Sequence, residues 1–188
     1  MYMKILSINE FAGTDKNDRI VLYHGTQAKF KSFDKSFVNS GYGMQEFGYG
    51  FYLTDDYETA KEYSRGGIVI KVSVPSKKYL SYKHIFSTEK RFIANKFFKY
   101  YTTVSESGRE LYQDQSSRDD FWNMECRYIL DANTGGDIYG TISSITGDDE
   151  ETSSFLRSIG YIGLMYSDDG SWKKTNYLIF DGSDIEVL

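Results

Sequence analysis

The chain has few residues that cross-link the backbone or fix its direction. Its 188 residues include one cysteine, one proline and two histidines. A single cysteine, Cys126, excludes a framework of intramolecular disulfides, which are typical of oxidising compartments. The sequence therefore favours a reducing cytoplasm, either of the cell that makes the protein or of a cell that receives it.

Long apolar runs and an excess of positive charge are also missing. No stretch approaches the roughly 18 consecutive apolar residues of a membrane-spanning helix. The opening, MYMKILSINEFAG, lacks the long apolar core and small-residue cleavage site of a signal peptide. The net charge of −5 disfavours binding to nucleic acid through phosphates, since such binding needs a basic face. We expect neither a membrane nor a nucleic acid as partner.

The overall composition is that of a globular chain. Apolar residues make up 40% and charged residues 26%, and this length suits one domain, so we predict a single domain over residues 1–188. Seventeen tyrosines and thirteen phenylalanines favour a β-rich core and a pocket that stacks on flat ligands. A biased coding sequence would give the same counts.

The apolar pattern predicts strands near both ends of the chain. A helix is expected over 55–64, capped by Thr54 or Asp55, because an acidic first turn precedes residues at helical spacing. Short apolar or alternating runs predict strands, the last two as a closing hairpin, at 20–24, 50–54, 68–74, 162–167 and 176–181.

The middle of the chain has a different pattern. Apolar residues at helical spacing predict a helical region at about 85–131, with helices over 88–101 and 119–130. The polar stretch 104–117 and the Gly/Asp/Ser-rich stretch 131–151 are expected to be surface loops. A short helix is expected at 152–158.

Two clusters near the N-terminus contain residues suited to binding a flat, polar ligand. His24 stands at a strand end in LYHGT, directly before a glycine that lets a backbone turn or a ligand approach closely. In FGYGFYLT, Tyr52 follows two glycines, and Tyr63 comes one helix later, so the two rings could enclose a heterocycle. Each feature alone also fits a structural role, as a hydrogen-bonding histidine and as core tyrosines.

Taken together, LYHGT, FGYGFYLT and the AKEY that ends in Tyr63 resemble the nicotinamide-binding core of ADP-ribosyltransferases of the His-Tyr-Glu type, which include the poly(ADP-ribose) polymerases. The ending NYLIFDGSDIEVL resembles the last core strand of that family. The matched segments cover residues 20–74 and 160–188. The resemblance implies an α+β fold, with two small, mostly antiparallel sheets packed as a split β-sandwich with flanking helices, and NAD⁺ in the cleft between the sheets.

The resemblance also implies a role for each matched residue. The backbone of Gly25 would hold the nicotinamide carboxamide, and His24 would bind a ribose hydroxyl, with Thr26 supporting the same edge. Tyr52 and Tyr63 would stack on nicotinamide. Cleavage of the bond between nicotinamide and ribose would pass through an oxocarbenium-like state, which a carboxylate stabilises. No metal is implied.

The sequence departs from the family at the catalytic glutamate, whose place before the last apolar run is taken by Asn176. Asparagine can bind a ribose hydroxyl but supplies no charge. Another carboxylate could act instead, and Asp168 and Asp169 in the turn SDDGSWKKT are the first candidates, although an ordinary acidic turn would look the same. Glu125 is a further candidate, but on a predicted helix it is more typical of a solvated charge. Alternatively, the protein binds NAD⁺ without reacting it, or the acceptor supplies the base.

These features predict a mono-ADP-ribosyltransferase that moves ADP-ribose from NAD⁺ to a protein, since in the resembled family the glutamate is tied to chain elongation. Small standalone relatives from bacteria and phages act on host proteins, and a host protein is the expected acceptor. The alternative hypothesis is an inactive relative that binds NAD⁺ or a partner.

Overall fold

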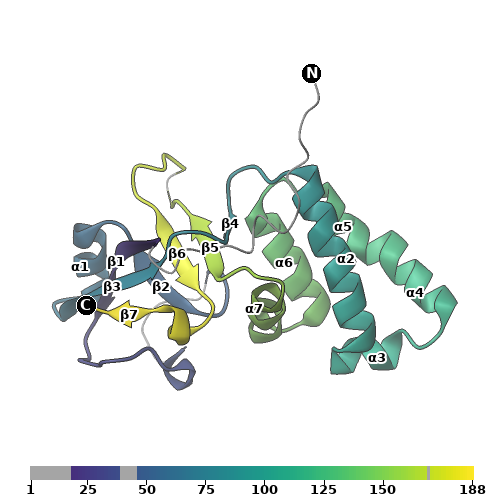
Figure 1. Cartoon of the computed structure of the whole chain (residues 1–188), viewed down its shortest axis with the longest axis horizontal. Coiled ribbons are helices and arrows are strands. Elements are labelled where there is room, and N and C mark those ends of the chain that lie inside the picture. The colour runs from purple at the N-terminus through teal and green to yellow at the C-terminus, as the bar shows by residue number, and fades with distance from the viewer. Residues whose placement is uncertain (1–17, 39–45, 169) are drawn as a thin grey trace.

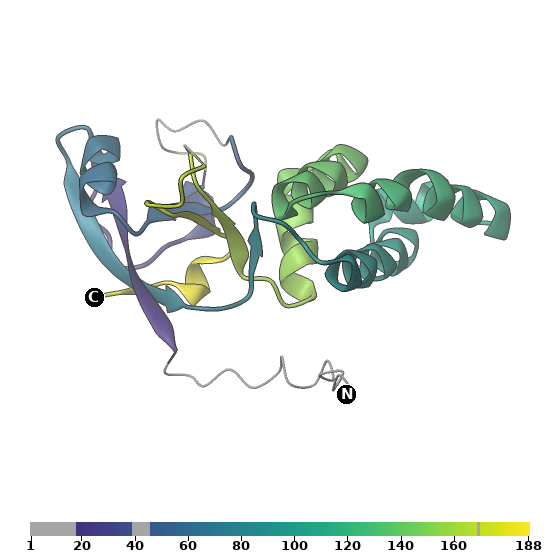
Figure 2. The same cartoon turned by 90° about the horizontal axis from the view of Figure 1, so that it is seen from above.

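The computed structural model describes residues 18–38, 46–168 and 170–188. The N-terminal segment MYMKILSINEFAG and Asp169 therefore lie outside the described residues. A β-sheet with the helix α1 forms one end of the molecule, and the helices α2 to α7 form the other (Figure 1). The view from above shows the same two parts side by side, joined along β4 and β5 (Figure 2).

Every strand predicted from the sequence is present, so the α+β class is confirmed. The hairpin of β5 and β6 is antiparallel, as expected. Two short strands, β4 and β7, were not predicted, because three and two residues are too few to show an alternating pattern. The strands in chain order are β1 (Arg19–Thr26), β2 (Phe51–Thr54), β3 (Ile68–Pro75), β4 (Tyr79–Ser81), β5 (Gly163–Tyr166), β6 (Asn176–Ile179) and β7 (Glu186–Val187).

The strands form one sheet in the order β4-β5-β6-β2-β1-β3-β7, where the resemblance implied two. The continuity of this sheet depends on one residue pair, so the split sandwich is not confirmed. Tyr23 of β1 is opposite Thr54 of β2, and this pair alone joins the two halves. By contrast, β1 pairs with β3 along its whole length. The sheet is therefore continuous but narrow at the β1–β2 junction, where the two strands diverge.

Each face of the sheet contributes to a different hydrophobic core, because side chains alternate between faces along a strand. What we call the helical core lies between β4–β6 and helices α2 to α7; from the sheet it includes Leu80, Leu164, Tyr166 and Leu178. What we call the strand core lies on the other face and consists of Leu22, Phe33, Phe51, Leu53, Ile70, Val72, Val74, Ile179 and Ile185.

The helix α1 (Tyr57–Ser64) is where it was predicted, but its N-cap is Asp56. The Asp56 carboxylate accepts a hydrogen bond from the Thr59 amide at 2.8 Å. The predicted caps have other roles: Thr54 is the last residue of β2, and the Asp55 carboxylate accepts from the Thr175 amide at 2.9 Å. A cap one residue later satisfies the same unpaired amides of the first turn.

The helical region extends further than predicted. The stretches 104–117 and 131–151, expected as loops, contain helices, because polar composition concealed good caps. Thr134 and Asp137 form a capping box, and buried Ile138, Tyr139 and Ile142 follow at helical spacing. The helices are α2 (Ser87–Thr103), α3 (Glu106–Leu111), α4 (Gln115–Phe121), the π-helical turn η3 (Trp122–Cys126), α5 (Arg127–Asp131), α6 (Gly135–Thr146) and α7 (Asp149–Ser158), with the 3-10 turns η2 (Lys35–Phe37) and η4 (Gly182–Asp184) outside this region.

Among the residues that the structure describes, no helix has the length and apolar character needed to cross a membrane.

Candidate functional site

Asn176 and Asp168, the residue at the glutamate position and a candidate replacement carboxylate, lie next to each other. Asn176 begins β6, between Thr54 of β2 and Tyr166 of β5, and only 6% of it is exposed. Its side-chain amide donates a hydrogen bond of 2.8 Å to the carboxylate of Asp168. Asp168 itself lies at the surface, in the turn between β5 and β6. A carboxylate thus stands directly beside the position where the resembled family has its glutamate.

The turn that carries Asp168 is fastened to the start of α1. The Lys174 ammonium lies 2.8 Å from the Asp56 carboxylate and 3.2 Å from the Thr59 hydroxyl. This contact, with the bonds from Thr59, lowers the pKa of Asp56 to about 2. The helix α1 also carries Tyr63. The contacts of Lys174 therefore join the turn that contains Asp168 to the helix that contains Tyr63.

The negative charge of Asp168 affects the pKa of two tyrosines. Burial raises the pKa of the Tyr166 hydroxyl, and the negative charge of Asp168 raises it further, as do the neighbouring hydroxyls of Tyr52 and Tyr63. The pKa of Tyr63 is raised by partial desolvation and then by Asp168, although 67% of the residue is exposed. The negative charge of Asp168 thus acts on both tyrosines, and Tyr166 is also paired with Asn176 in the sheet.

Tyr52 packs against the helical core, and its hydroxyl is already engaged. It donates to the Gly48 carbonyl at 2.9 Å and accepts from the Phe47 amide at 3.2 Å. Burial raises the pKa of Tyr52 to about 12, so this phenol stays neutral at physiological pH. Tyr52 can offer a ring to a ligand, whereas its hydroxyl fixes the turn before β2.

Three aromatic residues of this region were missed by the sequence analysis. The ring of Phe47 stacks on Tyr166 with centroids 4.0 Å apart, and Tyr82 packs against both rings. Phe47 belongs to the FGYGFYLT motif, so its position near Tyr52 was a usable signal. Tyr82 and Tyr166 come from distant parts of the chain, and no sequence pattern indicated that they lie near Phe47.

His24 is joined to Tyr52 through the backbone and not by a shared pocket. Its Nδ1 lies 2.9 Å from the Tyr52 carbonyl oxygen, just beyond the single residue pair that links β1 and β2. The ring packs edge-on against Phe33 of the strand core, with centroids 5.2 Å apart. His24 therefore bridges the two strands where they diverge, and its ring lies with the core opposite the one that Tyr52 contacts.

The burial of His24 predicts a pH dependence of stability. Burial lowers its pKa from the ordinary value of 6.5, partly offset by the bond to the Tyr52 carbonyl. The unfolded chain then binds the proton more readily, so the free energy of unfolding should fall as the pH drops below 6.5. Urea denaturation between pH 5 and 7.5 measures this. His24→Gln, which retains a donor but does not titrate, should flatten the slope.

Replacement of the exposed histidine, His84→Gln, is the matched control for that measurement. If His84→Gln flattens the slope and His24→Gln does not, the assignment of the pH dependence to His24 is wrong.

Gly25 and Thr26 end β1 beneath α1. A Cβ atom on Gly25 would overlap the carbonyl oxygen of Ala60 and lie 2.7 Å from the Ser64 amide nitrogen. This glycine is thus required by the close packing of β1 on α1, which is a structural reason separate from any contact with nicotinamide. The Thr26 hydroxyl accepts from the Ala28 amide at 3.2 Å and shapes the turn that leaves the strand.

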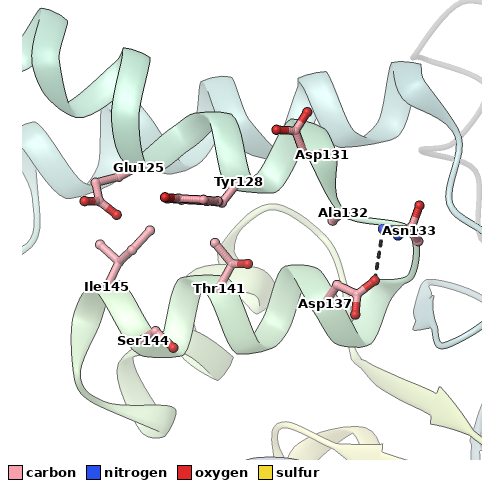
Figure 3. Close-up of a pocket in the computed structure, with 9 residues that line it drawn as sticks. All are labelled: Glu125, Tyr128, Asp131, Ala132, Asn133, Asp137, Thr141, Ser144 and Ile145. Atoms are coloured by element: carbon pink, nitrogen blue, oxygen red, sulfur yellow. Dashed lines mark hydrogen bonds between the residues drawn. The ribbon is translucent and has the colours of Figure 1, made fainter.

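Glu125 is not near this site. It lies in the helical region, where it lines an open groove of about 470 Å³ between α5 and α6 (Figure 3). The described residues contain no cluster of three or more His, Cys, Asp or Glu side chains that could hold a metal ion. Of the two candidate carboxylates that the structure describes, Asp168 is the one that lies beside Asn176.

Comparison with known protein families gives a match over most of the chain. The sequence model of the family described as ADP-ribosyltransferase in polyvalent proteins matches residues 15–185. No curated protein matches the chain. A solved structure of an anti-CRISPR protein aligns with 92% of this chain and 97% of its own, at 16% identity and a TM-score of 0.35. At that TM-score the likeness carries no inference about fold or function.

Proposed function

This chain belongs to the family of ADP-ribosyltransferases in polyvalent proteins, and on that premise we propose that it cleaves NAD⁺ and transfers a single ADP-ribose to a protein. The observation that carries the proposal is the hydrogen bond from Asn176 to Asp168. It supports the idea that two residues together replace the catalytic glutamate. Asn176 supplies the position in the sheet, and Asp168 supplies the charge.

The residues around Asp168 suit the substrate. Nicotinamide is a flat ring that carries positive charge in NAD⁺, and such a ring is attracted to aromatic faces. The exposed ring of Tyr63 and the half-buried ring of Tyr52 would bind it. Loss of nicotinamide leaves positive charge on the ribose, and a carboxylate held in place beside the ribose stabilises such a charge. Asp168 would serve this purpose and orient the attacking group of the acceptor.

His24 and Gly25 would position the groups that bind NAD⁺. His24 holds the Tyr52 carbonyl and so fixes the strand from which the Tyr52 ring projects. Gly25 allows α1 to lie close enough to the sheet for Tyr63 to reach the same region. Transfer of one ADP-ribose follows from Asn176, because the residue tied to chain elongation is absent. A host protein in the recipient cytoplasm remains the proposed acceptor.

The test is incubation of the purified chain with NAD⁺ and a bacterial lysate, followed by mass spectrometry. The expected result is free nicotinamide together with a protein that has gained one ADP-ribose unit. Absence of both products, under conditions where a known transferase gives them, would overturn the proposal.

Asn176 also favours a second candidate, an NAD⁺-binding module without turnover. In that case NAD⁺ should raise the melting temperature, because a ligand specific to the native state stabilises it, while no nicotinamide is released. Transfer and binding are thus separated by measuring both on the same preparation.

Asn176→Leu tests whether Asn176 acts through Asp168. The variant removes the 2.8 Å hydrogen bond in a buried place with a side chain of similar size. We expect the transfer rate to fall roughly 10- to 100-fold, since a hydrogen bond to a charged group is worth roughly 1.5–3 kcal/mol. In the Asp168→Asn background the same change should cost less than about twofold, because residues acting together are not additive. Equal losses in both backgrounds would show that Asn176 acts independently of Asp168.

A further inference from the structure

The groove between α5 and α6 lies in the helical region, away from the sheet that holds Asp168 and Asn176 (Figures 1 and 3). Tyr128 lines the α5 wall of the groove, and Thr141 and Ile145 face it from α6 (Figure 3). The groove therefore combines an aromatic ring, an apolar side chain and hydroxyl or carboxyl groups on a surface open to solvent.

The surrounding chain is strongly acidic. Residues 115–151 contain nine Asp and Glu residues and two basic residues, Arg118 and Arg127. Within the groove, two carboxylates are already engaged. Asp137 accepts the Thr134 amide at 2.9 Å in the cap of α6, and Asp131 pairs with Arg127 at 3.8 Å. These two carboxylates therefore already have partners within the chain.

Glu125 differs from those two carboxylates. It is half-buried, and within the described part of the chain its carboxylate has neither a hydrogen bond nor an ion pair. Its negative charge also affects a buried neighbour. Burial, followed by the charge of Glu125, raises the pKa of the Cys126 thiol to about 12. A half-buried carboxylate without a partner is stabilised when a cation approaches it.

Tyr128 supplies the second half of a cation site. It is 62% exposed, and its hydroxyl end points toward Glu125 along the same wall of the groove (Figure 3). An exposed aromatic ring attracts an ammonium or guanidinium group through its π-face. The long apolar stem of lysine or arginine would lie against Ile145, which lines the same groove.

We propose that this groove binds a lysine or arginine side chain presented by the protein that receives ADP-ribose, and so selects acceptors with a basic surface. The identity of the occupant as the acceptor rests on the proposed function. The binding itself does not, because the groove and the transfer site share no residue. The acidic stretch around the groove also attracts a basic protein over a distance and raises its rate of encounter.

The test is binding of a fluorescein-labelled hexa-arginine peptide to the full chain without NAD⁺, followed by fluorescence polarisation at low salt. Glu125→Gln should weaken binding about threefold to fivefold, and the double variant with Tyr128→Ala about tenfold. Glu110→Gln removes the same charge from an exposed position on α3 and should leave binding within about twofold. A hexaglycine peptide should not bind.

Equal weakening by Glu125→Gln and Glu110→Gln would mean that only diffuse charge attracts the peptide, and the proposal would be overturned. Absence of peptide binding to the unaltered chain would overturn it as well. Asp168→Asn should bind the peptide as the unaltered chain does. The binding result therefore stands whether or not transfer of ADP-ribose is observed, so failure of one proposal is distinguishable from failure of the other.

Discussion

Asp168→Asn is expected to lower the rate of ADP-ribose transfer by about 100- to 1000-fold, the usual cost of removing one preorganised group that stabilises transition-state charge. The change keeps the size of the side chain and removes its negative charge. Asp168 lies at the surface, so folding should be unaffected. NAD⁺ affinity should change by less than about threefold, because the charge is needed when the nicotinamide bond breaks. Single-turnover rates and calorimetric titration with NAD⁺ measure the two quantities separately.

Asp120→Asn is the matched control for that experiment. Asp120 is exposed on α4, and its replacement removes the same charge far from the sheet. Transfer should stay within about twofold. If Asp168→Asn retains full activity, the charge that stabilises the transition state comes from elsewhere, and an acceptor that supplies the base becomes the leading explanation.

Gly25→Ala is expected to destabilise the fold by about 3 kcal/mol, at the upper end of the cost of overpacking. The new methyl group would meet the backbone of α1 at Ala60 and Ser64, and backbone atoms cannot move aside as a flexible side chain would. The helix must shift from β1, and Tyr63 moves with it. For a chain of this length we expect a fall in melting temperature of roughly 6–12 °C, with weaker binding of NAD⁺. Thermal unfolding with and without NAD⁺ measures both effects.

Gly140→Ala is the control for adding a methyl group to a glycine. Gly140 lies within α6, and a Cβ there would meet nothing within 4 Å. Alanine should stabilise the helix by about 0.5–1 kcal/mol. An unchanged melting temperature in Gly25→Ala would show that α1 adjusts to the methyl group, and the packing argument would be wrong.

The sequence was most informative where short elements follow one another. The strands β1, β2 and β3 and the helix α1 were predicted close to their true bounds, because alternation and helical spacing are local properties. The helix α6 was missed because two glycines and several polar residues at its start are typical of a loop. Its capping box and the spacing of Ile138, Tyr139 and Ile142 were the stronger signals.

The site was predictable only in part, for a related reason. Asp168 and Asn176 are eight residues apart across a hairpin turn, so their meeting could be proposed from the hairpin alone. The approach of Phe47, Tyr82 and Tyr166 depends on which strands are neighbours, and strand order is not a local property. The structural need for Gly25 likewise depends on how close α1 lies, which no single-chain pattern specifies.

The central position of β6 affects when the candidate site forms during synthesis of the chain. This strand separates β2 from β5 in the sheet, yet a ribosome makes it after α1 to α7. Until β6 has emerged, β2 and β5 lack their common partner, and Asp168 has no asparagine to hold it. Long-range pairings of this kind form late in folding. A nascent chain without β6 therefore has an incomplete sheet and lacks the hydrogen bond between Asn176 and Asp168.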